Sequence, residues 1–319
     1  MKQISDVETT TSSRPALLTV LMASGLLAGV RSKRGVCIME GRALQPTAMR
    51  ILDFYDRHPI SESQVLDAVR RARDDETLTA DDLYPFDQDH YGGLGAVDAL
   101  ARRAGITPAS RVLDVGAGLG GPARFLASRR GCRVVGVELH PDRAAGMERL
   151  TRRVGLRHAV SVVRADATAL PFGAARFDAC LSQEALLHVA DKAAVLAEAR
   201  RVLLPGGRLA FSDWIAHSGL GDLERARLAD WMAAVTLQSL DGYRALLGRI
   251  GFRSVAAEDL TDEWRAILRE RLAMYRALRE DTVRRLGEAR YREYDALYAF
   301  FVGLVEAGKL GGGRFSATR

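Results

Sequence analysis

The segment SQEALLHV, residues 182–189, places two side chains that can do acid–base chemistry four positions apart. The carboxylate of Glu184 can hold a cation, and the imidazole of His188 can accept a proton near neutral pH. If the segment begins a helical turn, both side chains share one face. Structural roles stay open, because a helix dipole favours an acid in its first turn and hydrogen bonds can hold a histidine at the edge of a core.

A second candidate site is the glycine-rich turn of VLDVGAGLGGPAR, residues 112–124. Glycine permits a tight turn and close approach of a ligand to the backbone, and the N-terminus of the following helix attracts negative charge. Gly116, Gly118 and Gly121 also fit the dinucleotide pattern GxGxxG. Glu138 lies 22 residues after Gly116, at the end of the next strand, where it can accept hydrogen bonds from ribose hydroxyls. The glycine loop alone therefore does not indicate which adenosine-containing cofactor binds.

The elements that must position these residues alternate between strand and helix from residue 111 onward. Short β-branched runs separated by amphipathic segments predict crossover units and a mostly parallel sheet covered on both faces. We expect an α/β fold with a doubly wound sheet of seven strands and helical lid insertions. The expected strands are residues 111–115, 133–138, 160–165, 177–182, 207–213, 251–260 and 313–318. Asp166, Ser182 and Asp213 then lie at the carboxyl edge of the sheet, where open α/β folds bind ligands.

Length and composition support one large core with a substantial cap, since the chain has 319 residues and 48% hydrophobic content. We expect an N-terminal extension of little order over 1–44, a helical cap over 45–107, the ligand-binding core over 108–260, and a helical lid with a terminal strand over 261–319. Ser61 and Gln64 form a plausible capping box in the cap. Trp264 and the Leu-Tyr stripe through 267–297 are expected to form the core of the lid.

Charge and cysteine content exclude several classes of function. The net charge of +6 arises from arginines scattered through helical segments, which favours solvated helix faces over a nucleic-acid surface. Cys37, Cys132 and Cys180 lie far apart, so neither a disulfide framework nor a metal site is expected, and the cytoplasm is the natural compartment. The apolar run at 16–30 is too short for an ordinary membrane span and lacks the flanks of a signal peptide.

The ordered set of motifs over about residues 81–260 resembles the Rossmann-like class of S-adenosylmethionine-dependent methyltransferases. The LGGPAR loop, the SQEALLHV block and the ending VEAGKLGGGRF are similar to the sarcosine and dimethylglycine N-methyltransferases. Phosphoethanolamine N-, sterol C- and certain sugar O-methyltransferases resemble the chain in the first two features. The glycine-betaine enzymes usually carry a tryptophan-glycine pair where Gly312 and Gly313 stand here, which leaves the amine substrate open. A dehydrogenase fits less well, because the glycine loop lies more than 100 residues into the chain and no Tyr-x-x-x-Lys pair is present.

The resemblance implies S-adenosylmethionine as the cofactor and assigns residues to it. The implied cofactor contacts are Asp114, Gly116, Gly118, Gly120, Glu138, Leu139, Asp166, Ala167, Ser182 and Gln183. Three further residues are implied as catalytic: Glu184 at the acceptor amine, His188 in proton removal, and Asp213 as the partner of His188. We also expect the acceptor to contact Tyr84, His90, Tyr91 and Trp214, although packing roles for Tyr84 and His90 are as plausible.

These observations lead to methyl transfer as the expected function. Methyl transfer is an in-line displacement at an activated carbon, so catalysis consists mostly of positioning and of removing a proton from the nucleophile. We expect a small-molecule methyltransferase, first of all an amine N-methyltransferase with His188 as base or positioning residue. O- or C-methylation of a sugar, polyketide or isoprenoid stays open, and an NAD-dependent oxidoreductase is a remote alternative. We expect no nucleic-acid partner, no stable membrane insertion and no metal, and a homodimer stays open.

Overall fold

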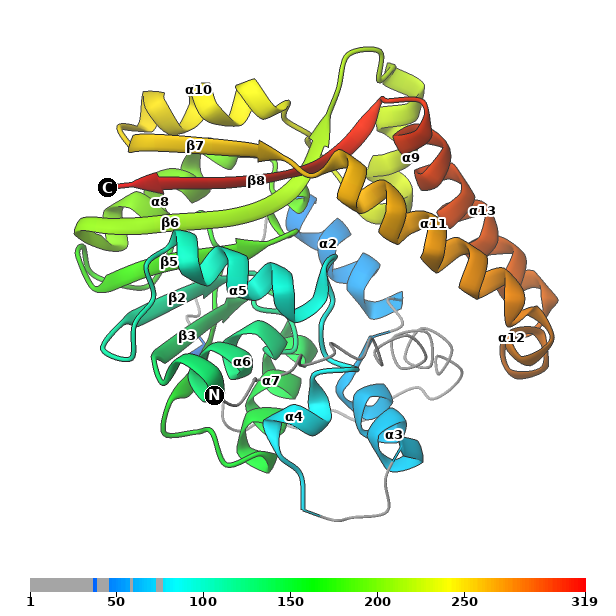
Figure 1. Ribbon diagram of the computed structural model, residues 1–319, viewed down its shortest axis with the longest axis horizontal. Helices are drawn as coiled ribbons and strands as arrows, with labels where there is room; N and C mark the ends of the chain where they lie inside the picture. The colour runs from blue at the N-terminus through cyan, green and yellow to red at the C-terminus, as the bar shows by residue number, and fades with distance from the viewer. Residues whose placement is uncertain (1–36, 39–45, 58–59, 73–76) are drawn as a thin grey trace, which may run out of the picture.

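A single mixed β-sheet forms the centre of the molecule (Figure 1). The structure is a computed structural model that describes residues 37–38, 46–57, 60–72 and 77–319. The strand order across the sheet is β1-β4-β3-β2-β5-β6-β8-β7. The strands are β1 (Cys37–Ile38), β2 (Arg111–Val115), β3 (Arg133–Glu138), β4 (Val160–Arg164), β5 (Phe177–Gln183), β6 (Leu203–Ala216), β7 (Arg253–Asp259) and β8 (Leu310–Thr318).

The predicted seven-stranded, mostly parallel sheet is confirmed in strands β2 to β8. Neighbouring strands from β4 to β6 pair in parallel, whereas β8 lies between β6 and β7 and is antiparallel to both. The two-residue strand β1 adds a parallel edge beside β4 that the sequence analysis did not anticipate. The parallel part of the sheet therefore directs the ends of β2, β3, β4 and β5 to one edge, as the site requires.

Helices cover both faces of the sheet, which makes it doubly wound. One face packs against α5 (Gly93–Arg103), α6 (Gly121–Arg130) and α7 (Pro141–Arg153), through buried residues such as Leu100, Leu126 and Met147. The other face packs against α8 (Lys192–Val202) and α10 (Leu240–Ile250), through residues such as Leu196 and Leu247. Because both faces are buried, the strands read as almost continuous apolar runs. Helix α5, which we had predicted as part of the cap, packs on the sheet itself.

The N-terminal cap contains α2 (Pro46–Arg57), α3 (Glu62–Ala72) and the short α4 (Ala80–Leu83). The capping box predicted at the start of α3 is present, since the backbone N–H of Ser61 donates to Oε1 of Gln64 at 2.9 Å and the backbone N–H of Gln64 donates to Oγ of Ser61 at 3.4 Å. The prediction of an extension with little order over 1–44 falls outside the described residues, apart from Cys37 and Ile38.

The predicted long helical stretch near the C-terminus is three helices, α11 (Thr261–Ala277), α12 (Arg279–Leu286) and α13 (Glu288–Glu306). Helices α11 and α13 lie side by side and extend away from the carboxyl edge of the sheet, together with α9 (Asp222–Met232) (Figure 1). Gly312 of β8 allows α11 to pack closely, since a Cβ there would lie 2.3 Å from Cδ2 of Trp264. The tryptophan that packs against Gly312 of β8 therefore belongs to helix α11 and not to β8 itself.

Among the described residues, no helix is long and apolar enough to cross a membrane. Cys132 and Cys180 are both free thiols buried in the core. Burial raises the pKa of the Cys132 thiol to about 11, so this group stays protonated and behaves as a small apolar side chain.

Candidate functional site

Two cavities lie next to each other at the carboxyl edge of the parallel strands. The first, of about 320 Å³, is bounded by the glycine turn after β2, the ends of β3 and β4, and the turn after β5, and we call it the strand-edge cavity. The second, of about 420 Å³, lies between the same edge and helices α9, α11 and α13, and we call it the lid cavity. Tyr55 and His188 line both cavities, so these two residues stand at their junction.

The glycine turn of the strand-edge cavity requires glycine for two independent reasons. Gly116 and Gly118 have φ of 74° and 57°, in the left-handed region that side chains with a Cβ disfavour. A Cβ on Gly116 would also lie 2.3 Å from Cβ of Ala185, and one on Gly118 would lie 2.7 Å from a guanidinium nitrogen of Arg143. The turn therefore keeps backbone exposed to the cavity where a side chain would fill it.

Two carboxylates are held in place at the ends of β3 and β4. Glu138 is 7% exposed, and its two oxygens accept the backbone N–H groups of Gly118 and His140, both at 2.8 Å. Oδ1 of Asp166 accepts the backbone N–H and the hydroxyl of Thr168, both at 2.8 Å. A carboxylate oxygen has two lone pairs, so Glu138 can still accept hydrogen bonds from ribose hydroxyls.

The predicted cofactor contacts divide into two groups. Six of them line the strand-edge cavity: Gly116, Gly118, Glu138, Leu139, Asp166 and Ala167. The other four described residues, Asp114, Gly120, Ser182 and Gln183, are not part of its lining.

Two of these four residues have packing roles that explain their position. The hydroxyl of Ser182 is buried and donates to the backbone carbonyl of Val115 at 2.8 Å, which ties β5 to β2. A Cβ on Gly120 would lie 2.5 Å from Cγ of Met147, so this glycine permits close packing of the turn against α7. Both residues thus support the turn, and direct contacts of Ser182 and Gly120 with the cofactor stay predictions.

Asp114 and Gln183 differ from these two because each keeps a buried polar atom without a partner. Oδ2 of Asp114 and Nε2 of Gln183 have no hydrogen-bond partner among the described residues. Burial and the neighbouring Glu138 raise the pKa of the Asp114 carboxyl to about 7. Buried polar atoms are usually satisfied by protein, water or ligand, so these two atoms indicate a polar ligand or its water at this edge.

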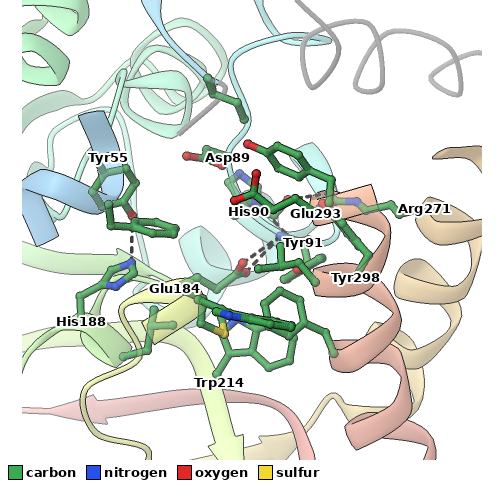
Figure 2. A pocket seen from close by; sticks show the side chains of 18 of the residues that line it. Tyr55, Asp89, His90, Tyr91, Glu184, His188, Trp214, Arg271, Glu293 and Tyr298 are labelled. Atoms are coloured by element: carbon green, nitrogen blue, oxygen red, sulfur yellow. Dashed lines mark hydrogen bonds between the residues drawn. The ribbon is translucent and has the colours of Figure 1, made fainter. Parts of the chain in front are cut away.

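The lid cavity brings together side chains from several separate parts of the chain (Figure 2). They come from α2, the loop before α5, the turn after β5, the end of β6, the end of α9, and the helices α11 and α13. Its walls contain many aromatic rings, among them Tyr91, Trp214, Trp231, Tyr298 and Phe301.

Glu184 and His188 both face the lid cavity, but not as neighbours on a regular helix face (Figure 2). Only Leu186–His188 form a short 3₁₀ turn, η1, and Glu184 precedes it with φ of 50°. A residue other than glycine in the left-handed region is strained, and such strain concentrates at functional sites. The backbone N–H of Glu184 donates to the carbonyl of Ser212 at 2.8 Å, which holds this conformation.

The carboxylate of Glu184 contacts the loop before α5. Both of its oxygens lie 3.1 Å from the backbone N–H of Tyr91, which donates to them. Burial raises the pKa of the Glu184 carboxyl well above its usual range. A cation bound in the cavity would favour the ionised form again.

The imidazole of His188 is held in one tautomer by its neighbours. Nδ1 lies 3.1 Å from the carbonyl oxygen of Ala233, which can only accept, so the proton is assigned to Nδ1. Nε2 then carries the lone pair and accepts the hydroxyl of Tyr55 at 2.9 Å. The basic nitrogen of His188 therefore points to the junction of the two cavities.

Asp213 does not orient His188 in the way that the resemblance implied. Its Oδ1 accepts the backbone N–H of Leu187 at 3.1 Å, and its Oδ2 accepts the hydroxyl of Tyr243 at 2.5 Å. The side chain is completely buried, which raises the pKa of its carboxyl to about 6. The role implied for Asp213 is thus corrected: it holds the backbone of the η1 turn, and Ala233 takes the place of the expected partner of the imidazole.

Three of the four predicted acceptor contacts, His90, Tyr91 and Trp214, line the lid cavity. Burial lowers the pKa of His90 to about 4, so this imidazole is neutral at pH 7. Tyr84 is the exception, because it is 5% exposed and packs edge-on against Phe125 at 5.6 Å between ring centroids. The prediction for Tyr84 is therefore corrected to a packing role in the turn that ends α4.

Several residues of the lid cavity were missed by the sequence analysis. Tyr55 lies 133 positions from His188 in the chain, and the guanidinium of Arg143 lies 4.4 Å from the centre of the Tyr55 ring. Arg271 of α11 lies 4.5 Å from the centre of the Tyr91 ring. Trp264 is buried in the lid core as predicted, and Tyr294 packs against the buried Tyr275 and Tyr291 but also lines the cavity. A contact pattern of this kind has no local sequence signal.

Comparison with known proteins identifies the family. A family model described as a methyltransferase domain matches residues 113–211. The 27-O-demethylrifamycin SV methyltransferase of Amycolatopsis mediterranei is 31% identical over 222 residues, which cover 68% of this chain and 78% of that relative. The chain belongs to the S-adenosylmethionine-dependent methyltransferases.

Other relatives of this methyltransferase are larger proteins. The glycine/sarcosine/dimethylglycine N-methyltransferase of Actinopolyspora halophila is 34% identical over 166 residues, which are 52% of this chain and only 29% of that enzyme. The solved phosphoethanolamine N-methyltransferase 2 of Haemonchus contortus, in complex with phosphomonomethylethanolamine and S-adenosylhomocysteine, superposes with a TM-score of 0.70 at 20% identity. That comparison covers 84% of this chain and 59% of the solved one, and it supports the fold.

The strand-edge cavity of this methyltransferase fits the cofactor of the family. Its glycine turn leaves room that a Cβ would fill, and Glu138 and Asp166 offer carboxylate oxygens to hydroxyl and amino groups. The predicted cofactor, S-adenosylmethionine, agrees with the family assignment.

Proposed function

We propose that this methyltransferase transfers the methyl group of S-adenosylmethionine to an amine nitrogen of a small molecule bound in the lid cavity. One observation carries this proposal: His188 lines both cavities and directs its unprotonated Nε2 toward their junction. An acceptor in the lid cavity would meet both the methyl donor and a proton acceptor there. We propose a cytoplasmic location, since its three cysteines lie far apart, and no nucleic-acid partner, since its arginines are scattered.

The charge of the lid cavity supports a cationic acceptor. Acidic side chains outnumber basic ones in its lining, with Asp89, Glu184, Asp230 and Glu293 against Arg271 and Arg290. The rings of Tyr91 and Trp214, whose centroids are 5.5 Å apart, can contribute cation–π contacts to a methylated ammonium group. The cavity of about 420 Å³ suits an amine attached to a larger, ring-bearing molecule.

The protein's own groups have separate tasks in the reaction. S-adenosylmethionine, when bound, supplies a methyl group already activated by its sulfonium. Glu184 would attract the ammonium form of the acceptor and hold the nitrogen near the end of β5. Nε2 of His188 would accept the proton from the nitrogen, since a protonated amine has no lone pair to attack with. The hydroxyl of Tyr55 occupies the lone pair of Nε2. It would therefore either move away before this step or relay the proton, donating its own to Nε2 while its oxygen accepts one from the nitrogen.

O-methylation is the second candidate, and two observations favour it. Burial raises the pKa of the Glu184 carboxyl, which favours its protonated form, and a protonated carboxyl can donate to an acceptor oxygen. The largely aromatic walls of the lid cavity suit an apolar natural product with a hydroxyl group. An O-methyltransferase would use the same His188 as base.

A screen with matched acceptors tests the proposal. Release of S-adenosylhomocysteine is measured for pairs that differ only in an amine or a hydroxyl at the reacting position. We expect turnover with the amine members, loss of activity in both His188→Ala and Glu184→Gln, and unchanged S-adenosylmethionine binding by calorimetry. Full activity in both variants would reject the site. Loss only in His188→Ala, with turnover of the hydroxyl members, would select O-methylation.

A further inference from the structure

Lys192 carries a buried ammonium group directly behind the η1 turn. The side chain is 3% exposed and lies at the first position of α8. Its Nζ donates to the carbonyl of Leu186 at 2.7 Å and to the carbonyl of Val189 at 3.2 Å, one residue on each side of the Leu187–His188 pair. The same Nζ contacts Thr236 at its carbonyl, 2.9 Å away, and at its hydroxyl, 2.5 Å away. A lysine is almost never buried unless such partners compensate its charge.

The contacts of Lys192 connect the two segments that determine the position and the tautomer of the His188 imidazole. The first is the η1 turn, which carries the imidazole. The second is the segment 233–236 after α9, in which Ala233 has φ of 50° and supplies the carbonyl oxygen that holds Nδ1. Thr236 lies in this second segment, and its hydroxyl also donates to the carbonyl of Val189 at 2.8 Å. The ammonium group thus fixes the distance between the imidazole and the carbonyl that sets its tautomer.

We propose that Lys192 is a positioning residue for His188, whose charged ammonium group clamps the η1 turn to segment 233–236 and thereby keeps the lone pair on Nε2. An uncharged or shortened side chain at this position would free both segments, and the ring could then exchange its tautomers. The inference rests on the proposed role of His188 as the base. Lys192 touches neither substrate nor cofactor in this role.

The charge state of Lys192 makes the clamp sensitive to pH. Burial lowers the pKa of Lys192 to about 8, and the carboxylate of Asp213 on β6 opposes this shift. The other titratable groups around it are Asp191, the N-cap residue directly before it, Tyr243 of α10 behind Asp213, and His188 itself. Burial raises the pKa of the Tyr243 hydroxyl, so this group stays neutral through the alkaline range. Activity should therefore fall as the pH rises above about 8, in the range where an amine acceptor becomes more nucleophilic.

The variant Lys192→Met removes the charge and keeps most of the length of the side chain. We expect kcat to fall about 100-fold, as displacement of a catalytic group by an ångström can do, while the affinity for S-adenosylmethionine changes less than about threefold. In ¹⁵N-histidine-labelled protein, the His188 resonances should change from those of the Nδ1–H tautomer to a mixture. Lys309→Met is the matched control, because Lys309 forms a partly exposed ion pair with Glu224 at 2.7 Å, and neither residue belongs to the η1 turn or to segment 233–236.

Retained kcat in Lys192→Met, or an unchanged tautomer of His188, would overturn the proposal. If this variant does not fold, a pH titration of the wild-type enzyme provides the test. Its His188 resonances should show loss of the single tautomer between pH 7 and pH 9.5, centred near the Lys192 pKa of about 8. Constant resonances over this range would refute the clamp. The NMR measurement needs no acceptor, so it separates this inference from the proposed function. Full activity in His188→Ala would reject the proposed function, whatever the tautomer.

Discussion

The ion pair between Asp87 and Arg124 anchors the loop that forms one wall of the lid cavity. Both side chains are completely buried, and Oδ2 of Asp87 accepts a hydrogen bond from Nη2 of Arg124 at 2.8 Å. Oδ1 of Asp87 accepts Nε2 of Gln88 at 2.6 Å. Because each oxygen faces a donor, Asp87→Asn places its amide N–H₂ against a donor whichever way the amide is turned. The variant also leaves the guanidinium buried without a counter-charge.

The size of the effect follows from these contacts. Removing one partner of a buried ion pair costs about 3–5 kcal/mol, which is a large part of a typical stability of about 5–15 kcal/mol. For a chain of this size, we expect the melting temperature to fall by roughly 5–15 °C. The loop continues into His90 and Tyr91, which line the lid cavity, so the KM for the acceptor should rise as well.

Urea unfolding followed by fluorescence, together with thermal scans, measures the change. Asp81→Asn is the matched control, because Asp81 of α4 pairs at 2.7 Å with Arg129, which lies on α6 like Arg124, but both of these side chains are more than half exposed. We expect this control to cost at most about 1 kcal/mol. The double variant Asp87→Leu/Arg124→Met should recover much of the lost stability, since it removes both buried charges.

Equal stability of the Asp87→Asn and Asp81→Asn variants would refute the reasoning. In that case the loop would be held by its apolar packing alone, and Arg124 would find another partner after the substitution. A double variant less stable than Asp87→Asn would refute the second part, that an uncompensated charge causes the loss.

Three further substitutions test other features of the site. Tyr55→Phe removes one hydrogen bond to the imidazole of His188 and should lower kcat about fivefold at constant cofactor affinity, and an unchanged kcat in steady-state assays would exclude a role for the hydroxyl. Gly116→Ala should weaken S-adenosylmethionine binding about tenfold or more by calorimetry, because its φ is 74° and its Cβ would lie 2.3 Å from Cβ of Ala185. Gly312→Ala should lower the free energy of unfolding by about 1–3 kcal/mol, since its Cβ would meet the ring of Trp264 at 2.3 Å, and denaturant unfolding with no loss would contradict that contact.

The sheet and the glycine turn at its edge are largely predictable from the sequence, because both depend on local patterns. The strands at 111–115 and 133–138 match the predicted ranges, since short β-branched runs between amphipathic segments have few other structures available. The glycines of the turn and Glu138 follow from the geometry of a strand-to-helix turn at the edge of a sheet. The position of β8 between β6 and β7 could not be predicted in this way, because it depends on strand pairing across the chain.

The sequence by itself determined the α/β fold, the glycine turn and the proximity of Glu184 and His188. Only the tertiary structure decided which groups bond to the site residues. Tyr55 bonds to Nε2 of His188 and the carbonyl of Ala233 bonds to its Nδ1, while Asp213 accepts the backbone N–H of Leu187 in the η1 turn. Hydrogen bonds between distant segments depend on shifts of an ångström or less in packing, whereas the period of apolar residues specifies only which face is buried. The local chemistry of the site is therefore encoded in short motifs, and its protonation state is set by the packing of the whole chain.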